Sequence, residues 1–466
     1  MSGFEIAFRN TVRNSRRSVP SIVAVALGTA AIVLFNGYVS YMIHGMQTGT
    51  VRSLGHLQVV RDGYLDFGRG NPGRFSIHNY EKVIAAIRQE AALQSRIAVV
   101  TPELDVYGIV GRDGRDESSS FAGEAWNPSE RRALGAWDGF DMHMPATRAT
   151  LNEDQPDSGV MGVGLAQLLD LCGDLKVPHC RALPQIMPSP AERAPGATTP
   201  DDLAALAATS MAVRPAPKPG ISVDLLAASP TGLPNVMRMT VLRTERQAIR
   251  DVDATYVAMP LALGQRLVFG PGVKAASTII VQLRQTSMMA PAHPILERVV
   301  KSIDPGLTVV DFHEVSPIYD QIVNNYRTIF RFIAVLMGLV TMFSVANTIT
   351  MAVAERTREI GTLRALGFER SAIRMVFLIE GALLGLIGAV SGVAGGLLIA
   401  RLVNAAGMTW TPPGRSAPIP LRIETVSQHE TLIASVLVLT ILACLSALRP
   451  ASRASRLPIT KALQHA

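Results

Sequence analysis

The sequence holds few side chains whose types and spacing would support catalysis. His313 and Glu314 begin like the H-E-x-x-H helix of a zinc protease, but Pro317 stands where the second histidine has to bind the metal. No G-x-S-x-G turn for a nucleophilic serine occurs, and no G-x-x-x-x-G-K-[ST] loop that would hold ATP phosphates. We therefore expect no catalytic residue in this chain, no enzyme activity of its own and no cofactor bound directly to it.

Two stretches rich in methionine and histidine are the candidates for a metal site. Thioether and imidazole ligands suit Cu(I), and they occur in DMHMP and SMMAPAH, as Met142, His143, Met144, Met288, Met289 and His293. Methionines of a core or surface produce the same letters more often, so we predict no metal site.

The three cysteines are too few for a disulfide scaffold. Cys172 and Cys180 both fall in the segment that we place outside the cytoplasm, where a disulfide would persist. A bridge between them and two free thiols both remain open.

Composition favours a membrane protein over a soluble enzyme. Apolar residues make up 48% of the 466 residues. Four apolar runs have the length needed to cross about 30 Å of hydrocarbon as helices, and they lie at 20–44, 328–353, 375–402 and 430–449. The first run is longer than the core of a signal peptide, about 7–15 residues, and no A-x-A-like cleavage site follows, so we expect it to be a retained helix.

The distribution of basic residues predicts the orientation. Arginines crowd the leader 1–19, the loop 354–374 and the tail 450–466, whereas the loop 403–429 has only Arg415 and Arg422. Because Lys and Arg in short loops stay cytoplasmic, both termini and the loop 354–374 are predicted to be cytoplasmic, with 45–327 and 403–429 on the other side. The net charge of +7 then needs no nucleic-acid partner.

The leader 1–19 carries Phe4, Phe8 and Val12 at helical spacing among arginines. This pattern suits an amphipathic helix at the cytoplasmic face of the membrane, and an ordinary basic flank is the alternative.

The long segment 45–327 is predicted to be one mixed α+β domain. Residues 80–93 have a helical pattern, and 96–111 and 276–284 are rich in β-branched residues typical of strands. Nine prolines fall in 178–219, which predicts an exposed insert with one short helix near 201–209. The fold class is therefore an α-helical membrane protein with four transmembrane helices and a large mixed α+β extracytoplasmic domain between the first and second helices.

A stalk helix is predicted near 315–327, at the junction with the second membrane helix. Apolar residues recur there every three or four positions, at Val315, Ile318, Ile322, Tyr326 and Ile329. The alternative is that this stripe packs against the outer domain.

Glycines and one carboxylate distinguish the third membrane segment, 375–402. Three G-x-x-x-G pairs, which let helix backbones approach closely in lipid, are formed by Gly381, Gly385, Gly388, Gly392 and Gly396. We expect tight helix packing, within the subunit or across a dimer. Glu380 is either a functional intramembrane carboxylate or one that reaches the interface or pairs with a nearby arginine.

The loop 354–374 is charged and helix-prone, although it lies between two apolar segments. Ile360 and Leu363 lie three residues apart, and Gly367 is placed to end a helix. Such a short amphipathic helix suits the binding of another protein, and a solvated basic loop is the alternative.

The residues ERTREIGTLRALG, 355–367, closely resemble the cytoplasmic loop of the superfamily of ABC transporter permeases that contains FtsX, MacB and the LolC/LolE-like lipoprotein-releasing proteins. In that family this loop is the coupling helix that docks on the ATPase. The resemblance implies a role in ATPase coupling for Glu355, Arg356, Arg358, Glu359, Ile360, Leu363, Arg364 and Gly367.

Other parts of the chain support this resemblance. VMGVGLAQLLDLCGD and DVDATYVAMPLALGQRL are similar to two signatures of the family's outer domain, and RPASRASRLPITKAL resembles its C-terminal ending. GHLQVV at 55–60 leans toward the lipoprotein-releasing branch. The proline-rich insert departs from the family pattern of this domain.

The resemblance implies a permease subunit of the bacterial inner membrane, MacB-like in its periplasmic domain. A separate ATPase subunit would bind ATP and Mg, which excludes members fused to their ATPase, and a second permease copy or a related permease would complete a dimer in membrane lipid. Lipoprotein release, with lipoprotein cargo, is the function we favour. The alternatives are an FtsX-like mechanotransmission scaffold that regulates a cell-wall hydrolase, and efflux of a small molecule or peptide with a periplasmic adaptor.

Overall fold

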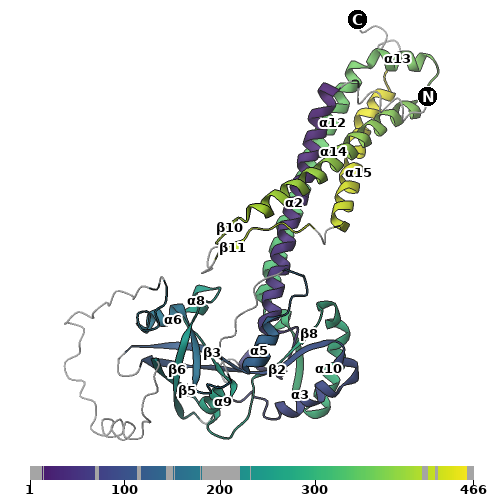
Figure 1. Ribbon diagram of the computed structural model, residues 1–466. Helices are drawn as coiled ribbons and strands as arrows, with labels where there is room; N and C mark the ends of the chain where they lie inside the picture. Colours follow the sequence, from purple (N-terminus) through teal and green to yellow (C-terminus); the bar gives the residue numbers. More distant parts are fainter. Residues whose placement is uncertain are drawn as a thin grey trace, which may run out of the picture. The chain divides into compact units, whose positions relative to one another are not determined.

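A computed structural model describes residues 15–68, 73–112, 117–142, 153–178, 221–230, 232–411, 418–425 and 429–458, with Arg13, Leu151 and Cys180 (Figure 1). The chain divides into a helical unit and an α/β unit, and each is described by itself. Several predicted features lie outside the described residues: Phe4, Phe8 and Val12, His143 and Met144, and nearly all of the insert 178–219 with its helix near 201–209.

Within the described residues, four helices are long and apolar enough to cross a membrane. They are α2 (Ser15–Leu54), α12 (Pro317–Glu355), α14 (Arg370–Ala406) and α15 (His429–Ser455). Each contains one of the four apolar runs. α12 begins at Pro317, a residue suited to the first helical position because the N–H there has no partner in the helix. α14 ends at Ala406 and is capped by Gly407, whose φ of 59° is left-handed.

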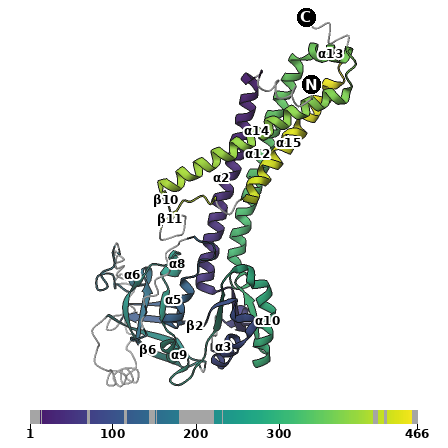
Figure 2. The same ribbon diagram turned by 45° about the vertical axis from the view of Figure 1, so that its right-hand side comes forward.

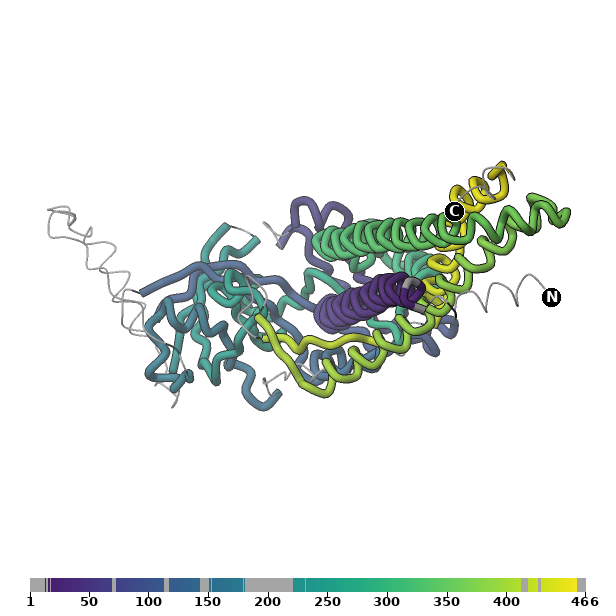
Figure 3. Tube along the Cα trace, turned by 90° about the horizontal axis from the view of Figure 1, so that it is seen from above, coloured from purple at the N-terminus to yellow at the C-terminus, as the bar shows by residue number. Residues whose placement is uncertain are grey.

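The helical unit contains α2 up to Met46, α12 from Ile318, α14 and α15. Figure 3 shows the purple helix α2 between α12 and α14, and Figure 2 shows the same helices from the side. The Ser21 hydroxyl of α2 forms hydrogen bonds with Thr348 and Ser344 of α12. Hydroxyl groups in a bilayer have no water to bond with, so hydrogen bonds between helices satisfy them instead. The strands β10 (Thr409–Trp410) and β11 (Ile419–Pro420) form a short hairpin after α14.

The predicted stalk is interrupted at its start. Val315 ends a separate short helix, α11 (Phe312–Val315), and Ser316 leaves the helical region with φ of −130° and ψ of 74°. The following proline disfavours helical geometry at Ser316 and lacks the N–H that would continue the helix. In the predicted stalk part of α12, residues 317–327, the buried side chains are Tyr319 and Val323, whereas Ile318 is 62% exposed. The helical prediction therefore identified the element but not its buried face.

The α/β unit is built on one sheet with the strand order β3-β7-β4-β6-β5-β2-β8-β1-β9. The 16-residue strand β2 pairs with β8 through its first half and with β5 through its second half. β2 also pairs with β3, which brings the end of the sheet back to its middle. A partial barrel results, with its strands in the order β2, β3, β7, β4, β6 and β5. The bounds are β1 (Leu57–Arg61), β2 (Ile97–Arg112), β3 (Ser118–Trp126), β4 (Ser158–Gly162), β5 (Ile221–Ala228), β6 (Pro234–Glu245), β7 (Tyr256–Pro260), β8 (Thr278–Leu283) and β9 (Leu307–Asp311).

Helices cover this sheet and complete its apolar core. The predicted strands 96–111 and 276–284 correspond to β2 and β8, but the predicted helix 80–93 is two helices, because Glu90 is extended, with ψ of 110°. The apolar faces of α3 and α10 pack with the buried residues of β1, β2 and β8 in one cluster. The helices are α3 (Tyr80–Gln89), α4 (Ala91–Gln94), α5 (Pro128–Gly135), α6 (Val163–Leu168), α8 (Arg250–Asp253), α9 (Leu261–Phe269) and α10 (Met289–Ile303), with η1 (Tyr64–Gly68) and η2 (Thr286–Met288).

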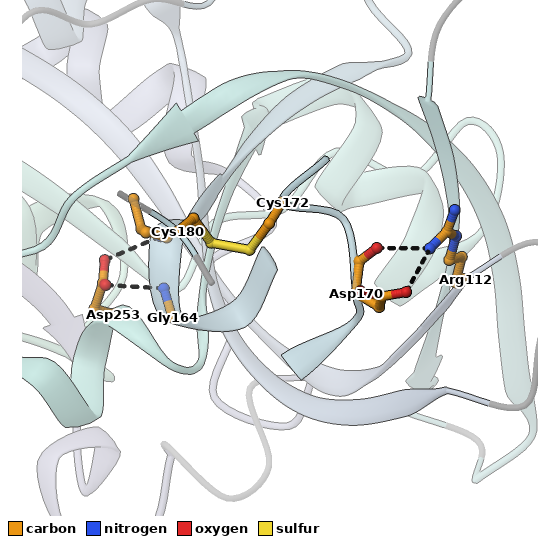
Figure 4. The surroundings of a disulfide bond; sticks show 7 residues. Arg112, Gly164, Asp170, Cys172, Cys180 and Asp253 are labelled. Carbon is orange, nitrogen blue, oxygen red and sulfur yellow. Dashed lines mark hydrogen bonds and ion pairs between the residues drawn. A yellow bond between two sulfur atoms is a disulfide. The ribbon is translucent and has the colours of Figure 1, made fainter. Parts of the chain in front are cut away.

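A disulfide joins Cys172 and Cys180 just after α6, so the bridged alternative is the one present (Figure 4). Arg112 of β2 supports the same turn through its contacts with Asp170, including a hydrogen bond to the backbone oxygen at 2.7 Å. The bridge therefore lies at the start of the chain that leads into the insert.

Asp253 links the two segments that resemble family signatures, 160–174 and 251–267. Its buried carboxylate accepts hydrogen bonds from the backbone N–H groups of Val163 at 3.1 Å, Gly164 at 2.9 Å and Gln247 at 2.8 Å (Figure 4). A β-carbon on Gly162 would overlap the backbone oxygen of Asp253. The glycine is therefore needed for the close approach that brings the carboxylate to the start of α6.

Replacing Asp253 by asparagine is expected to destabilise the protein by about 2 kcal/mol, because charge-assisted hydrogen bonds are lost and an amide N–H₂ group then faces N–H donors. Thermal unfolding of the detergent-solubilised full chain would measure the loss. Asp251→Asn is the matched control, since Asp251 is exposed two residues away. Equal midpoints for the two variants would contradict the structural role of Asp253.

His56 is buried in the α/β unit as a neutral imidazole. Its Nδ1 accepts a hydrogen bond from the backbone N–H of Leu283 at 3.0 Å, and its ring meets that of Trp137 edge-on at 5.1 Å. Burial lowers the pKa of His56 to about 4, because the charged ring would lose its hydration.

Acidification is expected to weaken the fold through His56. The unfolded chain takes up a proton near pH 6.5, whereas the folded chain excludes it down to about pH 4, so the contribution is complete above pH 6.5 and falls below it. The expected loss between pH 7.5 and 5 is about 2 kcal/mol. Thermal midpoints at both pH values would show a smaller drop for His56→Gln than for the parent protein, and identical drops would refute the role of His56.

Candidate functional site

The segment between α12 and α14 folds as one short helix, α13 (Thr357–Ala365). Gly367 follows it with φ of 93°, which suits glycine in a left-handed turn. The N–H groups of Gly367 and Phe368 donate to the carbonyl groups of Arg364 and Leu363, at 3.2 and 3.1 Å. These bonds satisfy carbonyls that the helix end would otherwise leave unpaired.

The eight residues that the resemblance assigned to coupling do not share one environment. Ile360 is buried and packs in an apolar cluster with Ile373 and Phe377 of α14. Leu363 and Arg364 are half-buried, and Arg356 is buried. The exposed members are Glu355, Arg358, Glu359 and Gly367.

Two exposed apolar residues were missed by the sequence analysis. Leu366 is 73% exposed and Phe368 is 46% exposed, one on each side of Gly367. Exposed apolar side chains in a segment that also exposes charges occur at sites that contact another protein or a membrane surface. No local signal in the sequence marks this exposure, because it depends on which tertiary neighbours pack against the turn. We call Glu355, Arg358, Glu359, Leu366 and Phe368 the docking face.

Arg356 lies between α12 and α13 and pairs with Glu380 of α14. Its Nη1 is 3.4 Å from Oε2 of Glu380, and both side chains are buried. Of the alternatives left open for Glu380, the structure shows the pairing with an arginine.

The five glycines of α14 that form the G-x-x-x-G pairs line its contacts with two helices of the same chain. A β-carbon on Gly381 or Gly385 would lie 2.8 Å from Cβ of Ala447 or 2.6 Å from Cβ of Ala443, both in α15. Gly388, Gly392 and Gly396 face Val25, Ala26 and Ala30 of α2, and a β-carbon on Gly392 would overlap the Ala26 oxygen. These contacts lie within the subunit, which the sequence left open.

The metal candidates within the described residues have structural surroundings. Met142 is buried, and Met288 and Met289 pack against the core of the α/β unit. His313 and Glu314 start α11, where their N–H groups donate to Asp311. No group of three or more His, Cys, Asp or Glu side chains that could hold a metal occurs in the described part of the chain.

Comparison with known proteins identifies the helical part of the chain. Residues 331–459 match the FtsX-like permease C-terminal family, and this range contains α13 and all of α14 and α15. The ABC transporter permease YtrF of Bacillus subtilis is 30% identical over 148 residues, which are 30% of this chain and 34% of the relative.

Two further relatives have similar matches. The macrolide export ATP-binding/permease protein MacB of Hyphomonas neptunium is 28% identical over 32% of this chain and 23% of its own length. The lipoprotein-releasing system transmembrane protein LolC of Xylella fastidiosa is 25% identical over 30% of this chain and 35% of its own length. The matches therefore span about a third or less of each relative. Residues 331–459 form an FtsX-like permease C-terminal domain, and the relatives of the chain include proteins named ABC transporter permease, MacB, FtsX and LolC.

Proposed function

We propose that this protein is the permease subunit of an ABC transporter of the bacterial inner membrane and that its docking face binds a separate ATPase subunit. The observation that carries the proposal is this face within the permease domain, where Arg358 and Glu359 of α13 are exposed, as are Leu366 and Phe368 in the turn that follows it. Apolar anchors surrounded by charges suit a specific protein contact.

The proposed topology puts both termini and α13 in the cytoplasm and the α/β unit in the periplasm. The basic residues that flank the four apolar helices support this orientation. The disulfide between Cys172 and Cys180 also supports it, because disulfides persist in oxidising compartments and are rare in the cytoplasm.

The proposed mechanism is mechanical. Closure of two ATPase subunits on bound ATP and Mg displaces α13, which packs through Ile360 against α14. α14 contacts α2 and α15 through its glycines, so its motion is shared by three membrane helices. Two ATPases require two permease chains, which are two copies of this protein or this protein and a related permease.

The proposed task is release of lipoproteins from the inner membrane. The lipoprotein-releasing relative LolC supports this cargo, and so does the α/β unit, which offers a folded domain outside the membrane to receive it. Two other roles compete with it. One is export of a small molecule, as in the name of the macrolide export relative MacB, and the other is a role in cell division, as in the name of the relative FtsX.

The test is affinity purification of the full-length protein from its native membrane in detergent, followed by mass spectrometry. Recovery of a P-loop ATPase together with lipoproteins would support the proposal. Recovery of the ATPase with a cell-wall hydrolase, or with a periplasmic adaptor and no lipoprotein, would replace the lipoprotein assignment. Recovery of no ATPase would refute the permease function.

A further inference from the structure

Arg356 and Glu380 are two charged side chains inside the helical unit. The side chain of Arg356 is 8% exposed and that of Glu380 is 4% exposed, with Nη1 and Oε2 3.4 Å apart. Charges removed from water need a partner, and removal of one partner leaves the other unpaired in a medium of low dielectric constant. Each of the two residues therefore fixes the place of the other.

Residues one helical turn from the pair along the chain are apolar and buried. Ala352 of α12, Ile360 of α13 and Phe377 of α14 belong to one buried cluster, which also includes residues of α15. Ala352 and Phe377 lie one helical turn before Arg356 and Glu380, respectively, and Ile360 lies one turn after Arg356. The ion pair therefore joins the junction of α12 and α13 to α14, next to apolar residues of these helices.

Arg356 does not use all its donors in this arrangement. Its Nε and Nη2 are buried and have no hydrogen-bond partner among the described residues. A guanidinium group pairs best with a carboxylate through two parallel bonds. The single contact at 3.4 Å is therefore one that a modest displacement of α13 would tighten or break.

Glu380 also lies next to the glycine contacts. The residue after it, Gly381, packs on Ala447 of α15, and Gly385 one turn further packs on Ala443. Close-packed helices transmit displacements because their side chains leave little free volume. A displacement at Glu380 is thus applied directly to the contact between α14 and α15.

We propose that Arg356 is a positioning residue, which fixes α13 on α14 through Glu380 and transmits movement of α13 into α14. The resemblance places Arg356 among the residues that meet the ATPase, whereas its burial gives it this internal role. The role in transmission rests on the proposed ATPase partner, but the positioning of α13 does not.

The first experiment measures positioning without an ATPase. Hydrogen exchange of the full-length protein in lipid nanodiscs is followed by mass spectrometry in peptides from α13 and α15. Arg356→Ala and Glu380→Gln are each expected to speed hydrogen exchange in α13 at least tenfold. The charge-swapped double variant R356E/E380R is expected to restore much of the protection. Arg401→Ala is the control, because Arg401 is an exposed arginine at the other end of α14. Unchanged exchange in α13 for both single variants would overturn the proposal.

The second experiment uses the ATPase that co-purifies with the parent protein. Arg356→Ala and Glu380→Gln should bind this ATPase with an affinity within twofold of the parent's. The permease changes the rate of ATP turnover by the ATPase, and in each variant this change should be at least tenfold smaller than in the parent. The charge-swapped double variant R356E/E380R should recover it. Weaker binding by Arg356→Ala alone would assign Arg356 to the docking contact and overturn the proposal. If exchange responds as expected but the parent retains no ATPase, the proposed function fails while the positioning of α13 by Arg356 stands.

Discussion

Changing Glu359 to lysine and Leu366 to aspartate together is expected to weaken binding of the ATPase about a hundredfold while leaving the permease folded. Residues that anchor a protein contact contribute about 1–3 kcal/mol each, and a combined loss of about 3 kcal/mol is about a hundredfold in affinity. Both side chains are exposed, so the helix and its buried face stay intact. The affinity of the purified variant for the co-purified ATPase measures the effect.

The choice of Leu366 follows from the structure. The apolar pattern of α13 favours Leu363 as the residue to change, but Leu363 is half-buried, and an aspartate there would disturb folding and docking together. Leu366 is 73% exposed, so its loss from the docking face costs the fold little.

A matched control comes from the α/β unit. Leu233 is 71% exposed there and Glu314 is also exposed, so Leu233→Asp with Glu314→Lys makes the same change of charge and apolar surface away from α13. This control should bind the ATPase as the parent does. If both double variants bind with parent affinity, the docking face lies elsewhere on the protein.

The elements that could be predicted from the sequence are those with a local cause. About twenty apolar residues in succession are needed to cross a bilayer, so the apolar runs identify α2, α12, α14 and α15 directly. The end of α13 could be predicted because Gly367 adopts the left-handed geometry that other residues avoid. Both signals lie within one stretch of chain, and neither needs knowledge of the tertiary structure.

The contacts that hold the site and the α/β unit together could not be predicted, because they join distant residues. Arg356 and Glu380 are 24 positions apart, and Asp253 accepts from Val163 across 90 positions. Nothing in the spacing of these residues selects one partner among several arginines or acids. The same limit applies to Tyr319 and Val323, because the apolar stripe of a helix is visible in the sequence but the side that becomes buried depends on its neighbours.

The glycines of α14 show the same division between local and tertiary information. The G-x-x-x-G spacing predicts close packing, and Gly396 does pack on α2. A β-carbon on the adjacent Gly395, by contrast, would meet no other atom within 4 Å. Spacing alone does not separate a glycine that is needed for contact from one that is not.

Gly392→Leu is therefore expected to disrupt the helical unit, whereas Gly395→Leu should be tolerated. A side chain at 392 would meet the backbone of Ala26 and Cβ of Thr29, and a helix backbone cannot rotate away as a side chain can. Overpacking of this kind costs about 3 kcal/mol or more. At 395, leucine meets open space and gains up to about 1 kcal/mol of helix propensity over glycine.

Thermal unfolding in detergent separates the two variants, since about 3 kcal/mol lowers the midpoint by about 10 °C. Gly385→Leu should behave like Gly392→Leu, because a β-carbon there would already lie 2.6 Å from Cβ of Ala443 in α15. If the unfolding midpoints of Gly392→Leu and Gly395→Leu fall equally, Gly392 is not needed for the contact between α14 and α2. If only Gly385→Leu is harmful, α14 is held by α15 alone, and movement of α13 would pass to α15 without engaging α2.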